Sequence, residues 1–221
     1  MKAEAIMLFK EDVLTLGRLV DRTVEEMLRM LKKDPSADLG FIEQQEVHIN
    51  RMFTEIEEKC LDLLLEKDML QEKDIRTLFV SASIASKFER MADHANRVAR
   101  IGSWAREDKL EVPSELPEMA DVVHKMVQEV LLCYITDSAQ KAQEILKRDS
   151  EVDYLDDVLS KKLLSDLGSQ DSARAQMRAQ FLFGGRFLER MGDLAGSIAK
   201  RSYFIATGER LKPEASGIAK G

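Results

Sequence analysis

All four prolines of this chain fall between long segments in which apolar residues recur every three or four positions. That spacing puts the apolar side chains on one face of an α-helix, and a proline inside such a helix would break it. The first segment shows the pattern in a stripe through Ile6, Phe9, Val13, Leu16, Val20, Val24, Met27 and Leu31. No segment looks like a β-strand. The sequence therefore predicts an all-α fold.

We expect six helices, at about residues 6–31, 42–63, 72–104, 118–146, 149–167 and 172–206. The clearest linker is the stretch EDKLEVPSELPE, which holds two prolines and no helical stripe. Asp171 or Ser172 is the expected N-cap of the sixth helix, and Gly208 is expected to end it. These breaks predict a first unit at 1–108, a linker at 109–115, a second unit at 116–210 and a flexible tail at 211–221.

The phrase E-R-M-x-D occurs twice, and its first residues, Glu89 and Glu189, are 100 positions apart. The second and fifth expected helices match at a separation of 103, which places Glu46 on Asp149 and Asn50 on Asp153. Duplication of a three-helix unit explains these matches better than chance. Helices with short connections pack antiparallel into bundles, so we predict two tandem three-helix bundles, with a single six-helix array as the alternative.

Each copy of the phrase places two acids one turn apart on the same helix face, Glu89 with Asp93 and Glu189 with Asp193. Like charges at this spacing cost about 0.2–0.5 kcal/mol in an isolated helix, so a bound cation is one explanation. Carboxylates suit iron, manganese, magnesium, calcium or zinc. The alternative is that Arg90 and Arg190 neutralise the acids in ordinary surface salt bridges.

Small residues lie beside these acids and favour the metal hypothesis. Gly185, Gly192 and Gly196 share the face of Glu189 and Asp193, and each interior glycine costs a helix about 0.8–1 kcal/mol relative to alanine. They leave room for an ion or for a closely packed helix.

Asp149 and Asp153 form a further acidic pair that could complete the second site. The alternative for this pair is a favourable interaction with the N-terminal dipole of the fifth helix. Their counterparts, Glu46 and Asn50, carry less charge, which predicts a weaker or empty site in the first unit.

Composition excludes several classes of function. The net charge of −7 argues against a nucleic-acid partner, and no segment has the roughly 18 uncharged apolar residues of a membrane span. No signal peptide is visible, and Cys60 and Cys133 are expected to be buried free thiols, which fits a cytoplasmic protein. The sequence has no phosphate loop, no nucleophile elbow and no E-x-x-H motif, so we expect no enzymatic activity.

The phrases ERMADHA and ERMGDLA, with DIRTLF, RDSEVDYL and YFIATGE, resemble the PhoU family of phosphate-signalling proteins. The resemblance covers roughly residues 9–209. It implies two three-helix bundles with multinuclear metal sites, built around Glu89 and Asp93 and around Glu189 and Asp193. Asp149 and Asp153 are a plausible addition, with iron, zinc, magnesium or manganese as the metal.

The resemblance also implies a regulatory role. Family members link the ATPase subunit of the phosphate ABC transporter to the phosphate-sensing histidine kinase, repress the phosphate-starvation response when phosphate is plentiful, and often dimerise. Two departures stand out. The family's asparagine four positions after each motif Asp is replaced by Arg97 and Ser197, and its lysine in the middle of the third helix is replaced by Ser83.

Three other functions stay open at this point. One is a helical scaffold without metal, and another is an accessory protein of a different phosphate transporter. The third, a carboxylate-bridged oxidase, would require histidine ligands on the faces that point into the bundle, and none is placed there.

Overall fold

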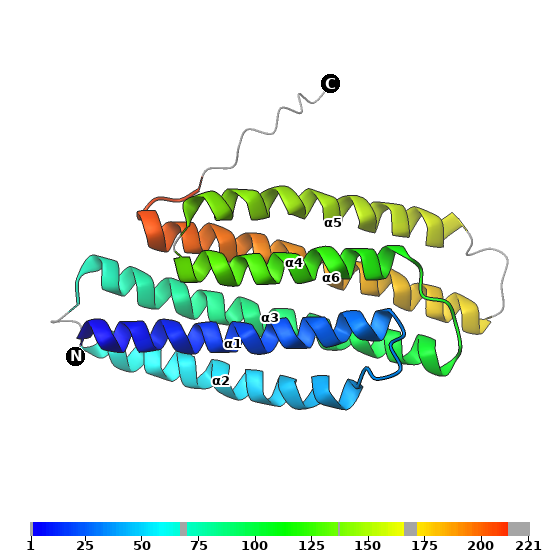
Figure 1. The fold of residues 1–221 in the computed structure, drawn as a ribbon, viewed down its shortest axis with the longest axis horizontal. Coiled ribbons are helices and arrows are strands. Elements are labelled where there is room, and N and C mark those ends of the chain that lie inside the picture. Colours follow the sequence, from blue (N-terminus) through cyan, green and yellow to red (C-terminus); the bar gives the residue numbers. More distant parts are fainter. Residues whose placement is uncertain (1, 67–69, 137, 166–171, 212–221) are drawn as a thin grey trace, which may run out of the picture.

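The computed structural model describes residues 2–66, 70–136, 138–165 and 172–211, and all regular structure within these ranges is helical (Figure 1). The helices are α1 (Lys2–Leu31), α2 (Leu39–Leu65), α3 (Glu72–Glu107), α4 (Glu115–Thr136), α5 (Ala139–Ser165) and α6 (Ser172–Thr207). The prediction of an all-α protein with six helices is confirmed.

Each half of the chain forms an antiparallel three-helix bundle, and the two bundles lie side by side. The bundles meet where α3 packs on α6 and α1 packs on α4, so α2 and α5 lie on the two outer sides (Figure 1). The apolar stripes of these helices merge into one continuous core. The prediction of two three-helix bundles is confirmed, whereas the unit boundaries at 1–108 and 116–210 stay a prediction.

Two contacts show how closely the bundles join. A Cβ atom on Gly17 of α1 would collide with the Leu131 side chain of α4, so the two helices approach closely at this glycine. The buried hydroxyl of Tyr134 in α4 donates a hydrogen bond of 2.8 Å to the Ser81 hydroxyl in α3. Each contact joins a residue of the first repeat to a residue of the second, so each bundle buries part of the surface of the other.

The structure corrects one helix boundary. We expected a break near residue 148, but α4 ends at Thr136 and α5 already begins at Ala139. The Ser138 hydroxyl accepts a hydrogen bond from the backbone N–H of Lys141 (3.3 Å), as an N-cap residue does. No proline or glycine marks this break, and the apolar spacing continues across it, which is why periodicity alone missed it.

The sequence also made predictions for the end of α6 and for the two cysteines. Gly208 has a φ of +75° and its N–H donates to the Phe204 carbonyl (3.0 Å), so it ends α6 as predicted. Cys60 and Cys133 are buried free thiols, as expected. Asp171 and nearly all of the predicted tail lie outside the described residues. No helix in the described part of the chain is both long and apolar enough to cross a membrane.

Candidate metal centre

The second bundle brings together acids from two helices. Asp149 and Asp153 lie on the face of α5 that packs on α6, opposite Glu189 and Asp193. Because α5 begins at Ala139, Asp149 and Asp153 lie in the helix interior, and the N-terminal dipole interpretation of this pair is wrong.

The pKa values of these acids report their proximity. Burial, followed by the charges of Asp193 and Asp153, raises the pKa of Asp149 to about 6. Burial and Asp193 also raise the pKa of Asp153, and burial is the main cause of the raised pKa of Glu189. Like charges and loss of water both disfavour the ionised carboxylates, so the cluster is electrostatically unfavourable at neutral pH.

The glycines of α6 are what allow this approach. A Cβ atom on Gly192 would lie 3.2 Å from Oδ1 of Asp149, and one on Gly196 would lie 3.8 Å from Oδ2 of the same residue. A Cβ atom on Gly185 would lie only 2.6 Å from Oδ1 of Asp156. The glycine face predicted beside Glu189 therefore receives the acidic face of α5.

Asp156 belongs to this cluster and was missed by the sequence reasoning. Its Oδ2 atom accepts a hydrogen bond from Nη1 of Arg186 (3.1 Å), whereas its buried Oδ1 atom has no hydrogen-bond partner among the described residues. The residue is 5% exposed. A usable signal did exist, because Asp156 follows Asp149 by two helical turns and so shares its face.

The arginine that partly neutralises the cluster is not the one we considered. Arg186 pairs with Asp156 and approaches Glu189 (3.9 Å). Arg90 and Arg190 form no salt bridge with the motif acids in the described part of the chain, although the charge of Arg90 acts on Glu89 from a distance, and both arginines also act on His94. The interpretation of the motif acids as ordinary pairs with the adjacent arginines is therefore not supported.

The first bundle holds a smaller cluster, made of Glu46 from α2 with Glu89 and Asp93 from α3. Burial, then the charge of Asp93, raises the pKa of Glu46 and of Glu89. Here an amide and an arginine intervene: Asn96 donates a hydrogen bond to the Glu46 carboxylate, and Arg100 donates to Asn96 (3.1 Å).

Asn50, the predicted counterpart of Asp153, is exposed as Asp153 is, but it carries no charge. The first cluster thus has fewer acids and more neutralising partners than the second, which supports the prediction of a weaker site without testing it.

The negative charge of the two clusters suits a cation, but their side chains do not form a ready-made binding site for one. Among the described residues, no three His, Cys, Asp or Glu side chains converge closely enough to hold a metal ion. A metal would require the carboxylates to rotate from the positions they hold here. The unpartnered oxygen of Asp156 and the raised pKa values of its neighbours are the observations that favour such an ion.

Histidine adds no ligand to these clusters. His94 lies between the bundles, where its ring stacks on Phe187 with 5.5 Å between the ring centroids. Burial, aided by Arg97, Arg190 and Arg90, lowers the pKa of His94 to about 4, so the ring is neutral at pH 7. His124 lies 3.1 Å from Asp21 on the other side of the molecule's core, and His48 is exposed.

Comparison with known proteins identifies the family. The chain matches the PhoU domain twice, over residues 13–102 and 116–202. It belongs to the PhoU family. The two matched segments correspond to the two three-helix bundles, so the duplication predicted from E-R-M-x-D is a duplication of the PhoU domain.

Several PhoU relatives share nearly the whole length of this chain. A phosphate-specific transport system accessory protein PhoU homolog from Clostridium acetobutylicum is 27% identical and covers 90% of this chain and 91% of its own length. The Zymomonas mobilis homolog is 29% identical, with 92% of this chain and 80% of the relative covered. These relatives are accessory proteins, and PhoU-family regulators are not enzymes, as the sequence led us to expect.

Two solved PhoU structures have the same fold. The phosphate transport system regulatory protein PhoU from Streptococcus pneumoniae superposes with a TM-score of 0.85 at 26% identity, covering 96% of this chain and 100% of that chain. PhoU from Pseudomonas aeruginosa gives a TM-score of 0.84 at 25% identity, with 95% and 100% covered. The arrangement of the two bundles is therefore that of the PhoU fold.

Proposed function

We propose that this chain is a regulator of phosphate signalling. It couples the ATPase subunit of a phosphate ABC transporter to a phosphate-sensing histidine kinase, and it represses the phosphate-starvation response when phosphate is plentiful. The observation that carries the proposal is the pair of PhoU domains, which spans nearly the whole chain as in relatives named phosphate-specific transport system accessory proteins. We place the regulator in the cytoplasm, as a homodimer.

A second part of the proposal is that the acidic clusters bind metal. Asp149, Asp153, Glu189 and Asp193 would hold the ion or ions in the second bundle, and Asp156 joins them from α5. Carboxylate oxygens suit iron, zinc, magnesium or manganese. The support is electrostatic. Asp156 is buried and Asp149 and Glu189 are half-buried, Arg186 is the only arginine that forms ion pairs with the cluster among the described residues, and a cation would remove the repulsion between the acids.

Glu89 and Asp93, with Glu46, would form the corresponding site in the first bundle. The amide of Asn96 already donates a hydrogen bond to the Glu46 carboxylate, so we expect a lower metal occupancy in this site.

Metal content tests this second part directly. Protein purified without chelator is analysed for bound metals beside the double variant Glu189→Gln plus Asp193→Asn, and beside Glu151→Gln, an exposed acid on α5, as the matched control. We expect bound metal in the wild type and in the control, and a loss of at least half in the double variant. Equal metal content in all three proteins, or none in any, contradicts the site.

The regulatory role is tested by binding to the two partners. Purified chain is used to capture the transporter ATPase subunit and the sensor kinase, with phosphate present and with phosphate depleted. Binding of both partners supports the coupling role. If the folded chain binds neither, the protein is a helical scaffold; if it binds only the ATPase of another phosphate transporter, it is an accessory protein of that system.

The scaffold function keeps one observation in its favour. Within the described residues the acids do not form a preformed metal site, and the shared core of the two bundles is complete without an ion. A scaffold predicts that the double variant leaves both metal content and partner binding unchanged.

A further inference from the structure

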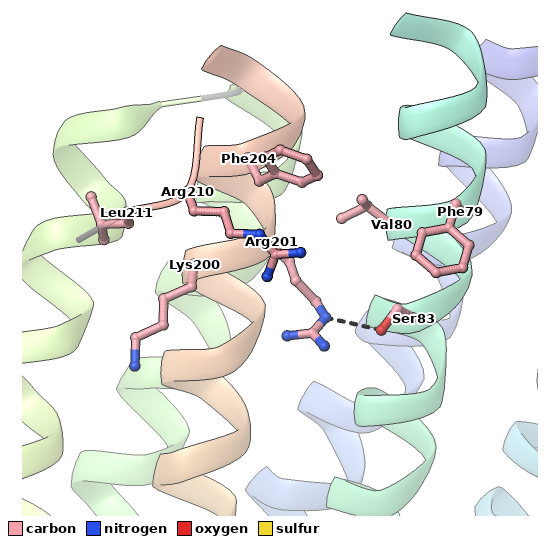
Figure 2. Close-up of a pocket in the computed structure, with 8 residues that line it drawn as sticks. All are labelled: Phe79, Val80, Ser83, Lys200, Arg201, Phe204, Arg210 and Leu211. Carbon is pink, nitrogen blue, oxygen red and sulfur yellow. Dashed lines mark hydrogen bonds between the residues drawn. The ribbon is translucent and has the colours of Figure 1, made fainter. Parts of the chain in front are cut away.

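A cationic pocket lies between the two bundles, where α3 begins and α6 ends (Figure 2). Its walls include Phe79 and Ser83 from α3, Arg201 and Phe204 from α6, and Arg210 from the segment after α6. The pocket has a volume of about 310 Å³. Figure 2 shows the guanidinium groups of Arg201 and Arg210 in the space between the two helices, whereas Lys200 points away along α6.

Among the described residues, the arginine at the centre of this pocket has only neutral hydrogen-bond partners. Nε of Arg201 donates to the Ser83 hydroxyl (2.9 Å), and its Nη1 donates to the Ser197 hydroxyl (2.9 Å). Burial and the nearby charge of Arg210 lower the pKa of Arg201. Lys87, one turn beyond Ser83, has a pKa lowered by burial and then by Arg201 and Arg90.

These cations gather without a counter-charge. Within the parts of the chain that the structure describes, none of Lys87, Arg201 and Arg210 forms an ion pair with a carboxylate. The protein as a whole has a net charge of −7, so acids are abundant elsewhere on its surface. Lys87 and Arg201 are half-buried and Arg210 is exposed, and like charges this close repel each other unless an anion lies between them.

The fold itself does not require these charges. The duplication creates a second pocket of about 310 Å³ at the opposite end of the α3–α6 contact, lined by Trp104, Asp108, Gln176, Met177 and Gln180. With the offset of 100 residues, Trp104 corresponds to Phe204 and Gln180 to Val80, so the two pockets are equivalent by the repeat.

Among the residues whose side chains the structure describes, no cation lines the second pocket, and Ile101, the counterpart of Arg201, is a core residue only 2% exposed. The same architecture therefore accepts an apolar residue where the first pocket has a half-buried arginine. The charge of the first pocket is a property of the sequence at that end alone.

We propose that this pocket binds a phosphate group, with Arg201 and Arg210 as its principal ligands and Lys87 adding charge from α3. A guanidinium offers two parallel N–H donors that match two oxygens of a phosphate, and the serines already hold Arg201 in place. Phe204 lies under the Arg210 guanidinium (5.6 Å to the ring centroid), and with Phe79 it forms an apolar wall.

Two sources of the phosphate fit the pocket. Inorganic phosphate uses the cations alone, and a phosphate ester such as a nucleotide also uses the aromatic wall. A pocket of about 310 Å³ is at the lower end of the range for small-molecule sites, whereas a protein segment needs a much larger contact area.

Binding of labelled inorganic phosphate and of ATP to the full chain tests the proposal. The protein is kept in EDTA, so that phosphate cannot be held through a metal in the acidic clusters, and at about 0.15 M salt, which screens weak surface attraction. The variants are Arg201→Gln, Arg210→Gln and Lys87→Gln. Lys161→Gln, an exposed lysine on α5, is the matched control for the change in net charge. Circular dichroism verifies that each variant is folded.

We expect saturable binding of one phosphate or one ATP per chain. The affinity falls about tenfold or more in Arg201→Gln and Arg210→Gln, and it is unchanged in Lys161→Gln. Tighter binding of ATP identifies a phosphate ester as the ligand class, and binding of inorganic phosphate alone identifies the free ion.

Three results would overturn the proposal. The first is that the folded wild type binds neither phosphate nor ATP. The second is that the arginine variants bind these probes as well as the wild type does. The third is that a glutamate decapeptide binds although neither phosphate nor ATP does, in which case the pocket is a docking site for an acidic protein segment. None of these results bears on the regulatory role, which is measured by partner capture.

Discussion

Replacing Asp149 with asparagine should stabilise the metal-free protein at neutral pH. The pKa of this acid rises from 3.8 to about 6 on folding, first because of burial and then because of Asp193 and Asp153. Between these two values the folded chain binds more protons than the unfolded chain, so the free energy of unfolding falls as the pH rises from about 4 to about 6. It then stays lowered at pH 7.

The size of the effect follows from this rise. A difference of about 2 pH units corresponds to roughly 3 kcal/mol. The Asp149 side chain retains part of its contact with water, which screens the repulsion, so we expect Asp149→Asn to gain about 1–2 kcal/mol at pH 7.5. The gain should shrink at pH 5, where the wild-type carboxyl is largely protonated.

Urea unfolding in EDTA at pH 5 and at pH 7.5 measures the difference. His94 also titrates on unfolding in this range, with the opposite sign, because its lowered pKa removes stability as the pH falls from 6.5 towards 4. That contribution is common to wild type and variant and cancels. Glu151→Gln makes the same charge change at an exposed position of α5 and should shift stability by no more than about 0.5 kcal/mol.

The reasoning fails if Asp149→Asn is less stable than the wild type at pH 7.5, or if its gain is the same at both pH values. The first result would mean that Asp149 is stabilised by partners that the folded structure does not show. A gain independent of pH would mean that the effect comes from packing and not from ionisation.

Two further predictions concern packing and can be checked by urea unfolding. Gly185→Ala should lower the free energy of unfolding by about 1–3 kcal/mol, because its Cβ would lie 2.6 Å from a carboxylate oxygen of α5. Gly184→Ala is the control: its Cβ would have its nearest neighbour at 3.3 Å, so it should change stability by less than about 1 kcal/mol. Equal losses would contradict a close approach specific to Gly185. Tyr134→Phe should lower the free energy of unfolding by about 1–2 kcal/mol, because it removes the buried hydrogen bond to Ser81 that joins the two repeats. Tyr154→Phe, at a side chain 68% exposed, is the control and should lower it by less than about 0.5 kcal/mol. If Tyr134→Phe leaves stability unchanged, the hydroxyl pair adds nothing to the interface.

Much of the fold was predictable because helix formation is governed by local spacing. Apolar residues every three or four positions define a stripe, and prolines and glycines mark most of the ends, as at Pro113 and Gly208. The break between α4 and α5 escaped this logic because Ser138 caps a helix without any interruption of the stripe. A single capping hydrogen bond is too weak a signal to stand out in a sequence.

The candidate site was predictable only in part. Glu189 and Asp193, with the glycines beside them, predicted that another helix packs closely against this face of α6, and in the structure that helix is α5. Asp156 and Arg186 were not predicted, since their roles depend on which faces of α5 and α6 meet.

By itself the sequence determined six amphipathic helices, a duplicated unit and paired acids on one face of α3 and of α6. Only the tertiary structure decided that Arg186, and not Arg190, neutralises the second cluster, and that Arg201 meets Ser83 across the two repeats. The physical reason is the range of the interactions. Helical periodicity is set within a few residues of the chain. Arg186 and Asp156, 30 positions apart, meet only after α5 packs against α6, and Arg201 and Ser83, 118 positions apart, meet only after α3 packs against α6.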